Sequence, residues 1–233
     1  MKVRTRKVPE WESELWSLLR EGDGEHCPLY DRCRNRLGGG WCPSENLSDI
    51  THFLDDKQFD ISKYSSILQS TGGRECGRTF QLVERLAEKY LQRVKVHYIP
   101  VPTRLFSLTD KQHPIEVRSV ALKRCHGAIW HVGDRWVIQL RENDTSVKKR
   151  LTLFHEVFHI LAHRKAGIVF RKRGCEVGSF NELLADYFAA CVLMPRKWIK
   201  EKWSKVKDLN QMAKIFNVPK PLMWFRLREI GLV

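Results

Sequence analysis

The sequence predicts an α+β fold in which helices pack against a small antiparallel or mixed sheet. Three observations support this prediction. Two alternating segments flank Gly133-Asp134 as the strands of a hairpin do, a largely apolar helix is expected over residues 151–163, and a second apolar helix follows from about residue 180. The order of a helix, strands and then two helices is typical of an α+β domain.

The elements before the two apolar helices are predicted from periodicity. An amphipathic helix is marked by apolar residues at helical spacing, namely Phe80, Val83, Ala87 and Tyr90. Residues 94–99 alternate like a strand, and residues 129–132 and 136–140 form the hairpin. We expect an exposed edge strand at Trp136–Leu140 beside the next helix, where it would hold a peptide in extended form.

The predicted helix at residues 151–163 carries an H-E-x-x-H pattern made by His155, Glu156 and His159. Histidines at i and i+4 lie on one face of a helix, so both rings can reach one metal at about 2.0–2.1 Å. Glu156 lies between them, near the open coordination position where a general base must stand. The pentapeptide alone is expected by chance in roughly a few per cent of such chains, and a solvated surface helix is the alternative.

The rest of this helix argues against a solvated surface. On a helical wheel its polar residues occupy one stripe about 100° wide, and apolar side chains cover the remaining circumference. A buried polar stripe needs partners, because an unpaired buried polar group costs about 1–3 kcal/mol, and a metal supplies them. His163 follows His159 by only four residues without an intervening glycine, so it does not match a metzincin ligand. We expect His163 to pack or hydrogen-bond beside the ligands.

The second apolar helix brings two acids to the same site. Glu182, Ala185, Asp186 and Ala189 stand at i, i+3, i+4 and i+7, so they share one face of the helix. The small alanines on this face allow another helix to approach closely. Glu182 is predicted as the third metal ligand, which leaves the fourth position for water. Asp186 is placed to accept the outer N–H of a ligating histidine. Because the flanks are apolar, this arrangement is favoured over a solvated acidic face.

The predicted chemistry is hydrolysis of an amide. The metal ligands are His155, His159 and Glu182, the metal is zinc, and Glu156 acts as general base on a zinc-bound water. Four residues are available to stabilise the oxyanion, and the sequence does not choose among them: Tyr98, His126, His131 and Tyr187.

Composition limits the class of protein. A chain of 233 residues forms one or two domains, and its formal charge of +14 suggests an acidic partner such as nucleic acid, with an ordinary solvated surface as the alternative. The longest apolar run is too short to cross a bilayer and no secretory leader is expected, so we expect a cytoplasmic protein without a membrane partner. The seven cysteines are then thiols or metal ligands rather than disulfides.

Two further regions are distinguished. Residues 1–75 form a Cys-bearing segment of unknown role, in which three cysteines with a fourth ligand would make a second, structural metal site or would remain free thiols. The three cysteines are Cys27, Cys33 and Cys42, and the candidates for the fourth ligand are His26, His52 and Cys76. Residues 76–233 form the main domain, which ends in helices from about 196 to 233. Those helices resemble a helix-turn-helix, and packing against the domain explains them equally well.

Three segments of the main domain resemble the ImmA/IrrE family of metallopeptidases. They are Trp136–Asn143, Lys149–His159 and Glu182–Ala190, the last followed by Leu193-Met194-Pro195. The family's E-x-x-A-[ND]-x-F-A and L-M-P signatures are matched position by position over roughly residues 79–233. One position departs from the pattern, since Phe158 stands where the family usually has glycine.

The resemblance implies a zincin-like fold and a zinc-dependent endopeptidase. It implies His155, His159 and Glu182 as ligands and Glu156 as the base, and it implies a substrate that is an XRE-type helix-turn-helix repressor, cut in a stress or mobile-element response. The alternative is a DNA-binding regulatory protein that retains a zincin fold with little or no protease activity. An intact Glu156 favours the first, because a purely structural metal site has no use for it.

Overall fold

The structure is a computed structural model that describes residues 8–21, 74–93, 95–123, 125–166 and 180–233. Its elements, in chain order, are α1 Glu10–Glu21, α4 Arg74–Arg93, a 3-10 helix η3 Thr103–Leu108, β1 Ile115–Val120, β2 Gly127–Val132, β3 Arg135–Arg141, α5 Ser146–Ala166, α6 Phe180–Leu193, α7 Arg196–Val206, α8 Leu209–Phe216 and α9 Lys220–Glu229. Among the described helices, none is long and apolar enough to cross a membrane.

The sheet is mixed, and its strand order is β1-β3-β2. β2 and β3 form the predicted antiparallel hairpin, whose turn contains Gly133 at a φ of +60°. β1 pairs with β3 in parallel. This arrangement confirms the α+β class with a small mixed sheet.

Two sequence-based expectations about the strands are wrong. We expected Trp136–Leu140 to be an edge strand, but these residues lie in β3, which is the central strand of the sheet. The edge strands are β1 and β2. Residues 95–100 form a turn and bends, because Lys95 takes a left-handed φ of 49° as its N–H closes the end of α4 on Gln92. β1 was not anticipated, although its alternating Ile-Glu-Val-Arg-Ser-Val sequence is a strand signal.

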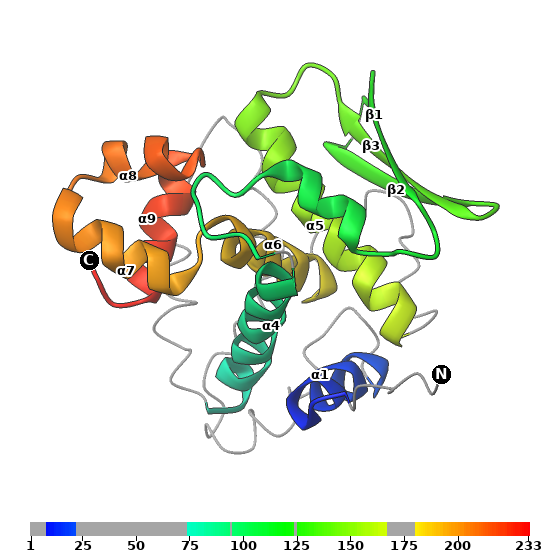
Figure 1. Cartoon of the computed structure of the whole chain (residues 1–233), viewed down its shortest axis with the longest axis horizontal. Helices are drawn as coiled ribbons and strands as arrows, with labels where there is room; N and C mark the ends of the chain where they lie inside the picture. Colours follow the sequence, from blue (N-terminus) through cyan, green and yellow to red (C-terminus); the bar gives the residue numbers. More distant parts are fainter. Residues whose placement is uncertain (1–7, 22–73, 94, 124, 167–179) are drawn as a thin grey trace.

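Helix α5 lies between the sheet and helix α6, and α4 packs on the far side of α6 (Figure 1). α1 packs on α4 and α5. The interior is one apolar cluster that includes α1, and its fully buried members include Leu15, Leu82, Ile138, Phe154 and Phe188. Because α5 is enclosed on several sides, the polar residues in its middle are buried and need polar partners, namely Thr152, His155, Glu156 and His159.

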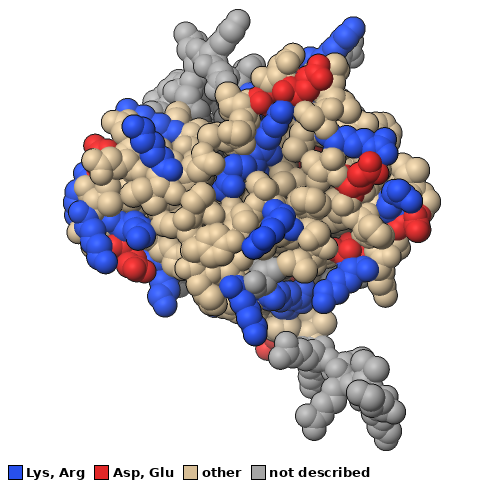
Figure 2. All heavy atoms as spheres, turned by 45° about the horizontal axis from the view of Figure 1, so that its top comes forward, with Lys and Arg blue, Asp and Glu red and all other residues tan. Residues whose placement is uncertain are grey.

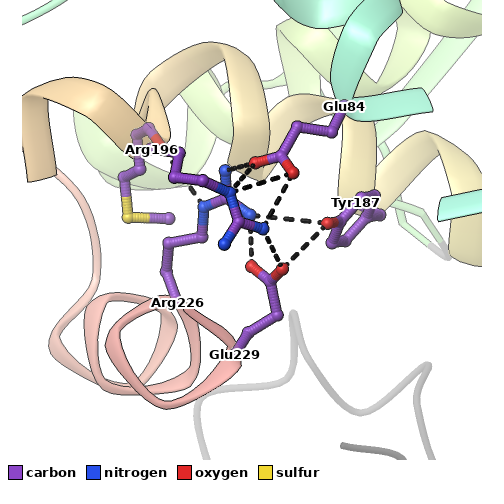
Figure 3. A network of polar contacts seen from close by, with 6 residues as sticks. Glu84, Tyr187, Arg196, Arg226 and Glu229 are labelled. Atoms are coloured by element: carbon purple, nitrogen blue, oxygen red, sulfur yellow. Dashed lines mark hydrogen bonds and ion pairs between the residues drawn. The ribbon is translucent and has the colours of Figure 1, made fainter. Parts of the chain in front are cut away.

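The C-terminal helices are attached by a buried ion network (Figure 3). Arg226 of α9 has no exposed surface and contacts Glu84 of α4 and Glu229 of α9, and its Nε donates to the carbonyl of Met194 at 3.2 Å. Arg196 of α7 lies 2.8 Å from both carboxylates. The network therefore joins three separate segments of the chain around the end of α6.

Several predicted features lie outside the described residues. They are the thiols of Cys27, Cys33, Cys42 and Cys76 and the rings of His26, His52 and His163. The second metal site in the Cys-bearing segment and the role of His163 therefore stay predictions.

Candidate metal centre

Helix α5 presents three polar side chains of the H-E-x-x-H pattern in a buried position. His155, Glu156 and His159 are 6%, 1% and 3% exposed. The two histidine rings face each other one helical turn apart, with 3.1 Å between their Nε2 atoms. Two ring nitrogens at this distance cannot both present lone pairs to each other, so either an N–H hydrogen or a metal ion lies between them.

Glu182 of α6 brings its carboxylate to the two histidine rings. Its Oε2 lies 3.1 Å from Nε2 of His155, and its Oε1 lies 3.2 Å from Nε2 of His159. Ligands about 2.0–2.1 Å from one tetrahedral zinc ion lie roughly 3.4 Å from each other, so the three observed separations are close to those of a zinc site. The donor set of two imidazoles and one carboxylate is also the set that zinc accepts, and the residues present fit the ion.

Asp186 orients one of the histidines. Nδ1 of His155 donates to the Asp186 carboxylate at 2.6 Å, so Nε2 is the ring nitrogen that faces Glu182 and His159. Sequence reasoning predicted this contact, and the structure confirms it. The contact fixes the ring and its tautomer, which is the usual arrangement beside a metal-ligating histidine.

The centre attracts positive charge. Burial lowers the pKa of His155, but Asp186 and Glu182 outweigh burial and raise the pKa to about 10. Burial raises the pKa of Glu182, and the rings of His159 and His155 outweigh it, so the Glu182 pKa lies well below its ordinary value. Glu182 is therefore ionised at neutral pH, and a divalent cation placed among these atoms would be stabilised by the same negative field.

Phe158 fills the space between the two ligand helices. It has no exposed surface, and its ring lies 5.5 Å from that of Phe188 on α6 and 6.2 Å from that of His159, measured between ring centroids. The departure from the family's glycine therefore adds apolar packing beside the metal centre and leaves the three ligand atoms together.

The residues that the sequence offered for the oxyanion have other partners. The Tyr187 hydroxyl points into the ion network, where it donates to Glu229 at 3.1 Å (Figure 3). His126 pairs with Asp144 at 2.8 Å, and the ring of His131 packs against Trp136. The hydroxyl of Tyr98, which is 52% exposed, accepts from Arg104 at 3.4 Å.

Sequence reasoning missed Gly127, which lies directly against Glu156. The available signal was a glycine at the start of a predicted strand, which often marks the close approach of another group.

A buried centre of two histidines and one carboxylate on adjacent helices, beside a small mixed sheet, is an arrangement typical of metallohydrolases. The family model Peptidase_M78, described as the IrrE N-terminal-like domain, matches residues 110–228. The chain therefore belongs to the IrrE N-terminal-like family, as the ImmA/IrrE resemblance implied, and the family indicates a metallopeptidase in general. Searches of curated proteins and of solved structures gave no match.

Proposed function

We propose that the protein is a zinc-dependent endopeptidase in which His155, His159 and Glu182 hold the metal and Glu156 is the general base. The observation that carries this proposal is the convergence of two histidine nitrogens and the Glu182 carboxylate, with 3.1–3.2 Å between the facing atoms, next to the buried carboxylate of Glu156. A structural metal site would be expected to hold a fourth protein ligand instead.

The residues divide the work of amide hydrolysis. Bound zinc would lower the pKa of a water molecule and polarise the carbonyl of the bond to be cut. Glu156 takes the proton from the attacking water and returns it to the leaving nitrogen, so it must be ionised at the start and protonated in between. Asp186 keeps His155 in the tautomer that binds the metal.

The substrate we propose is a protein segment that binds in extended form, as in an XRE-type helix-turn-helix repressor. Strand β2 supports this proposal, because it is an edge strand of the described sheet and its first residue contacts Glu156. The Arg141 N–H donates to the His126 carbonyl, so by alternation the main-chain groups of Gly127, Ile129 and His131 point away from β3. Within the part of the chain that the structure describes, these groups have no main-chain partner, so they can pair with a peptide.

The decisive experiment is cleavage of a defined protein. The zinc-loaded protein and its Glu156→Gln variant are incubated with the repressor encoded beside the gene, and the products are examined for a single cut. We expect the wild type to cleave the repressor, and the control variant Glu142→Gln, at an exposed position, to cleave it as well. The Glu156→Gln variant should retain zinc but cleave nothing. A Glu156→Gln protein that cleaves normally contradicts the assignment. Metal analysis of the same samples should give one zinc per chain, or two if the N-terminal cysteines hold a second.

Edge-strand pairing is tested separately. His131→Pro removes an outward-pointing N–H from β2, at a residue whose side chain is exposed. We expect a higher KM with the zinc content unchanged. A KM equal to that of the wild type in a folded variant would contradict pairing at β2.

A second candidate function is nucleic-acid binding, and the C-terminal helices favour it. Residues 196–233 hold ten Lys and Arg against three Asp and Glu. Arg196 and Arg226 are occupied by the ion network, but the lysines of α7 and its C-terminal end are largely exposed: Lys197, Lys200, Lys205 and Lys207. Basic side chains are also visible elsewhere on the surface (Figure 2), which weakens the case for one dedicated groove.

This second function predicts salt-dependent binding. A protein that neutralises several phosphates loses affinity steeply as salt rises. We would measure binding of the Glu156→Gln protein to duplex DNA at several salt concentrations, with Lys197, Lys200 and Lys205 changed to Gln as the comparison. The absence of binding at low salt removes this candidate, and it leaves the peptidase proposal untouched.

A further inference from the structure

Gly127, the first residue of β2, leaves no room for a side chain. A Cβ atom built on it would lie 2.5 Å from Oε1 of Glu156 and 2.5 Å from Cγ2 of Thr152. Non-bonded carbon contacts are most favourable at about 3.5–4.0 Å, so both separations are too short. The described glycines with positive φ are Gly133 and Gly231, so space rather than backbone conformation requires glycine at position 127.

The strand at Gly127 is held in place on its other sides. In the hairpin, Gly127 stands opposite Leu140, which is buried in the core. The carbonyl of the preceding His126 accepts the Arg141 N–H at 2.9 Å, and the His126 ring lies 2.8 Å from Asp144 at the connection into α5. A group added at position 127 therefore displaces the side chains of α5 more readily than the strand.

Of the two side chains in contact, Glu156 moves more easily. Its carboxylate is the far end of a flexible chain, whereas Thr152 is β-branched and is restricted in rotamer on a helix. Glu156 is only 1% exposed, so its carboxylate cannot simply turn into solvent. The carboxylate must shift within the buried site.

We propose that Gly127 is a positioning residue for the general base. Because it has no side chain, the Glu156 carboxylate rests against the backbone of the edge strand, in the place from which it takes the proton. This inference rests on the proposed function, since it assigns Gly127 a role only if Glu156 is the base.

A small change at position 127 should then affect turnover more than folding. A general base works within about 2.6–3.2 Å of the proton that it moves, and a displacement of about 1 Å costs on the order of 10²-fold in rate. For Gly127→Ala we expect kcat to fall roughly 10- to 100-fold, with KM within about two-fold and zinc affinity unchanged. The melting temperature should change little, because the carboxylate can move.

The experiment compares Gly127→Ala with Val132→Ile, which adds one carbon to an exposed residue of the same strand. The readouts are zinc stoichiometry and affinity, melting temperature, and kcat and KM for a mixture of internally quenched fluorescent peptides. A third variant, Gly127→Ala with Thr152→Ser, removes the contact with Cγ2 and isolates the contact with Glu156. It replaces Gly127→Ala if that protein does not fold.

The outcomes separate this inference from the proposed function. Loss of kcat with retained zinc, in either Ala variant but not in Val132→Ile, supports Gly127 as a positioning residue. Wild-type kcat in a zinc-loaded Ala variant overturns it. If the wild-type protein cleaves no peptide and no repressor, the proposed function fails instead. If the wild type is active, crystal structures of the wild type and the Gly127→Ala variant show whether the Glu156 carboxylate has moved, and an unmoved carboxylate overturns the inference.

Discussion

Two groups of buried charged side chains lie along helix α6, and they differ in charge balance. The metal centre, at the first half of the helix, contains the carboxylates of Glu156, Glu182 and Asp186 together with the rings of His155 and His159. The ion network, beyond the second half, contains two arginines and two glutamates, which neutralise one another (Figure 3).

The difference shows what each group is for. A buried cluster that holds its own counter-ions needs nothing more, and it fixes the packing of the helices that supply it. A buried cluster in which carboxylate oxygens converge with imidazole nitrogens can hold a cation from outside. Burial and charge alone therefore do not identify a functional site, whereas the convergence of metal-ligating nitrogen and oxygen atoms does.

The largest expected effect is loss of the metal in His159→Ala. Removal of one of three ligands should abolish stoichiometric zinc binding and peptidase activity, while the ion network stays intact. Added zinc should raise the melting temperature of the wild type, because a ligand that binds the folded state stabilises it, but not that of the variant. The exposed His97→Ala variant serves as control and should bind zinc normally. Full zinc binding by His159→Ala would remove this residue from the ligand set.

The ion network should respond to Arg226→Met by losing stability. The change leaves Glu84 and Glu229 short of a partner in a buried position, and breaking such a pair destabilises by about 3–5 kcal/mol. The measurement is the free energy of unfolding in denaturant. Arg228→Met on the same helix, where the side chain stacks on Trp224, should lose less than about 1 kcal/mol. Similar losses in the two variants would show that the network has no special role.

Asp186→Asn should weaken metal binding without breaking the fold. A residue that orients a ligating histidine typically contributes 10- to 100-fold in metal affinity, so we expect a loss of about that size. Asp144→Asn is the matched control, because Asp144 pairs with His126 away from the three ligands. Equal zinc affinity in wild type and Asp186→Asn would contradict the orienting role.

The smallest effect concerns pH. Burial raises the pKa of Glu84, but Arg226 and Arg196 outweigh burial and hold it below its ordinary value of 4.5. Because the folded pKa is the lower one, Glu84 contributes stability above pH 4.5 that is lost as pH falls through the folded pKa.

Unfolding free energies measured from pH 7 to pH 3 test this contribution. One such group adds at most about 1.4 kcal/mol per pH unit to the slope of the unfolding free energy against pH in the acid range. The slope should be smaller for Glu84→Gln than for the wild type or the exposed control Glu88→Gln. Identical slopes for all three proteins would show that Glu84 does not link the network to pH.

The sequence by itself determined the local part of the candidate site. His155 and His159 converge because a helix brings i and i+4 to the same face, and the same spacing relates Glu182 to Asp186. The hairpin around Gly133 and the helices at the C-terminus also follow from short-range periodicity. These features depend on geometry within a few residues, so the pattern of residue types was sufficient to predict them.

Only the tertiary structure decided which distant groups meet. β3 became central because β1 pairs with it in parallel, an interaction that alternation within β3 cannot reveal. Glu84 and Arg226 lie 142 residues apart in sequence, and Gly127 meets Glu156 only when the hairpin packs on α5. Such contacts depend on how whole elements pack, because a side chain's partners across an interface are set by register and orientation rather than by its own neighbours in sequence.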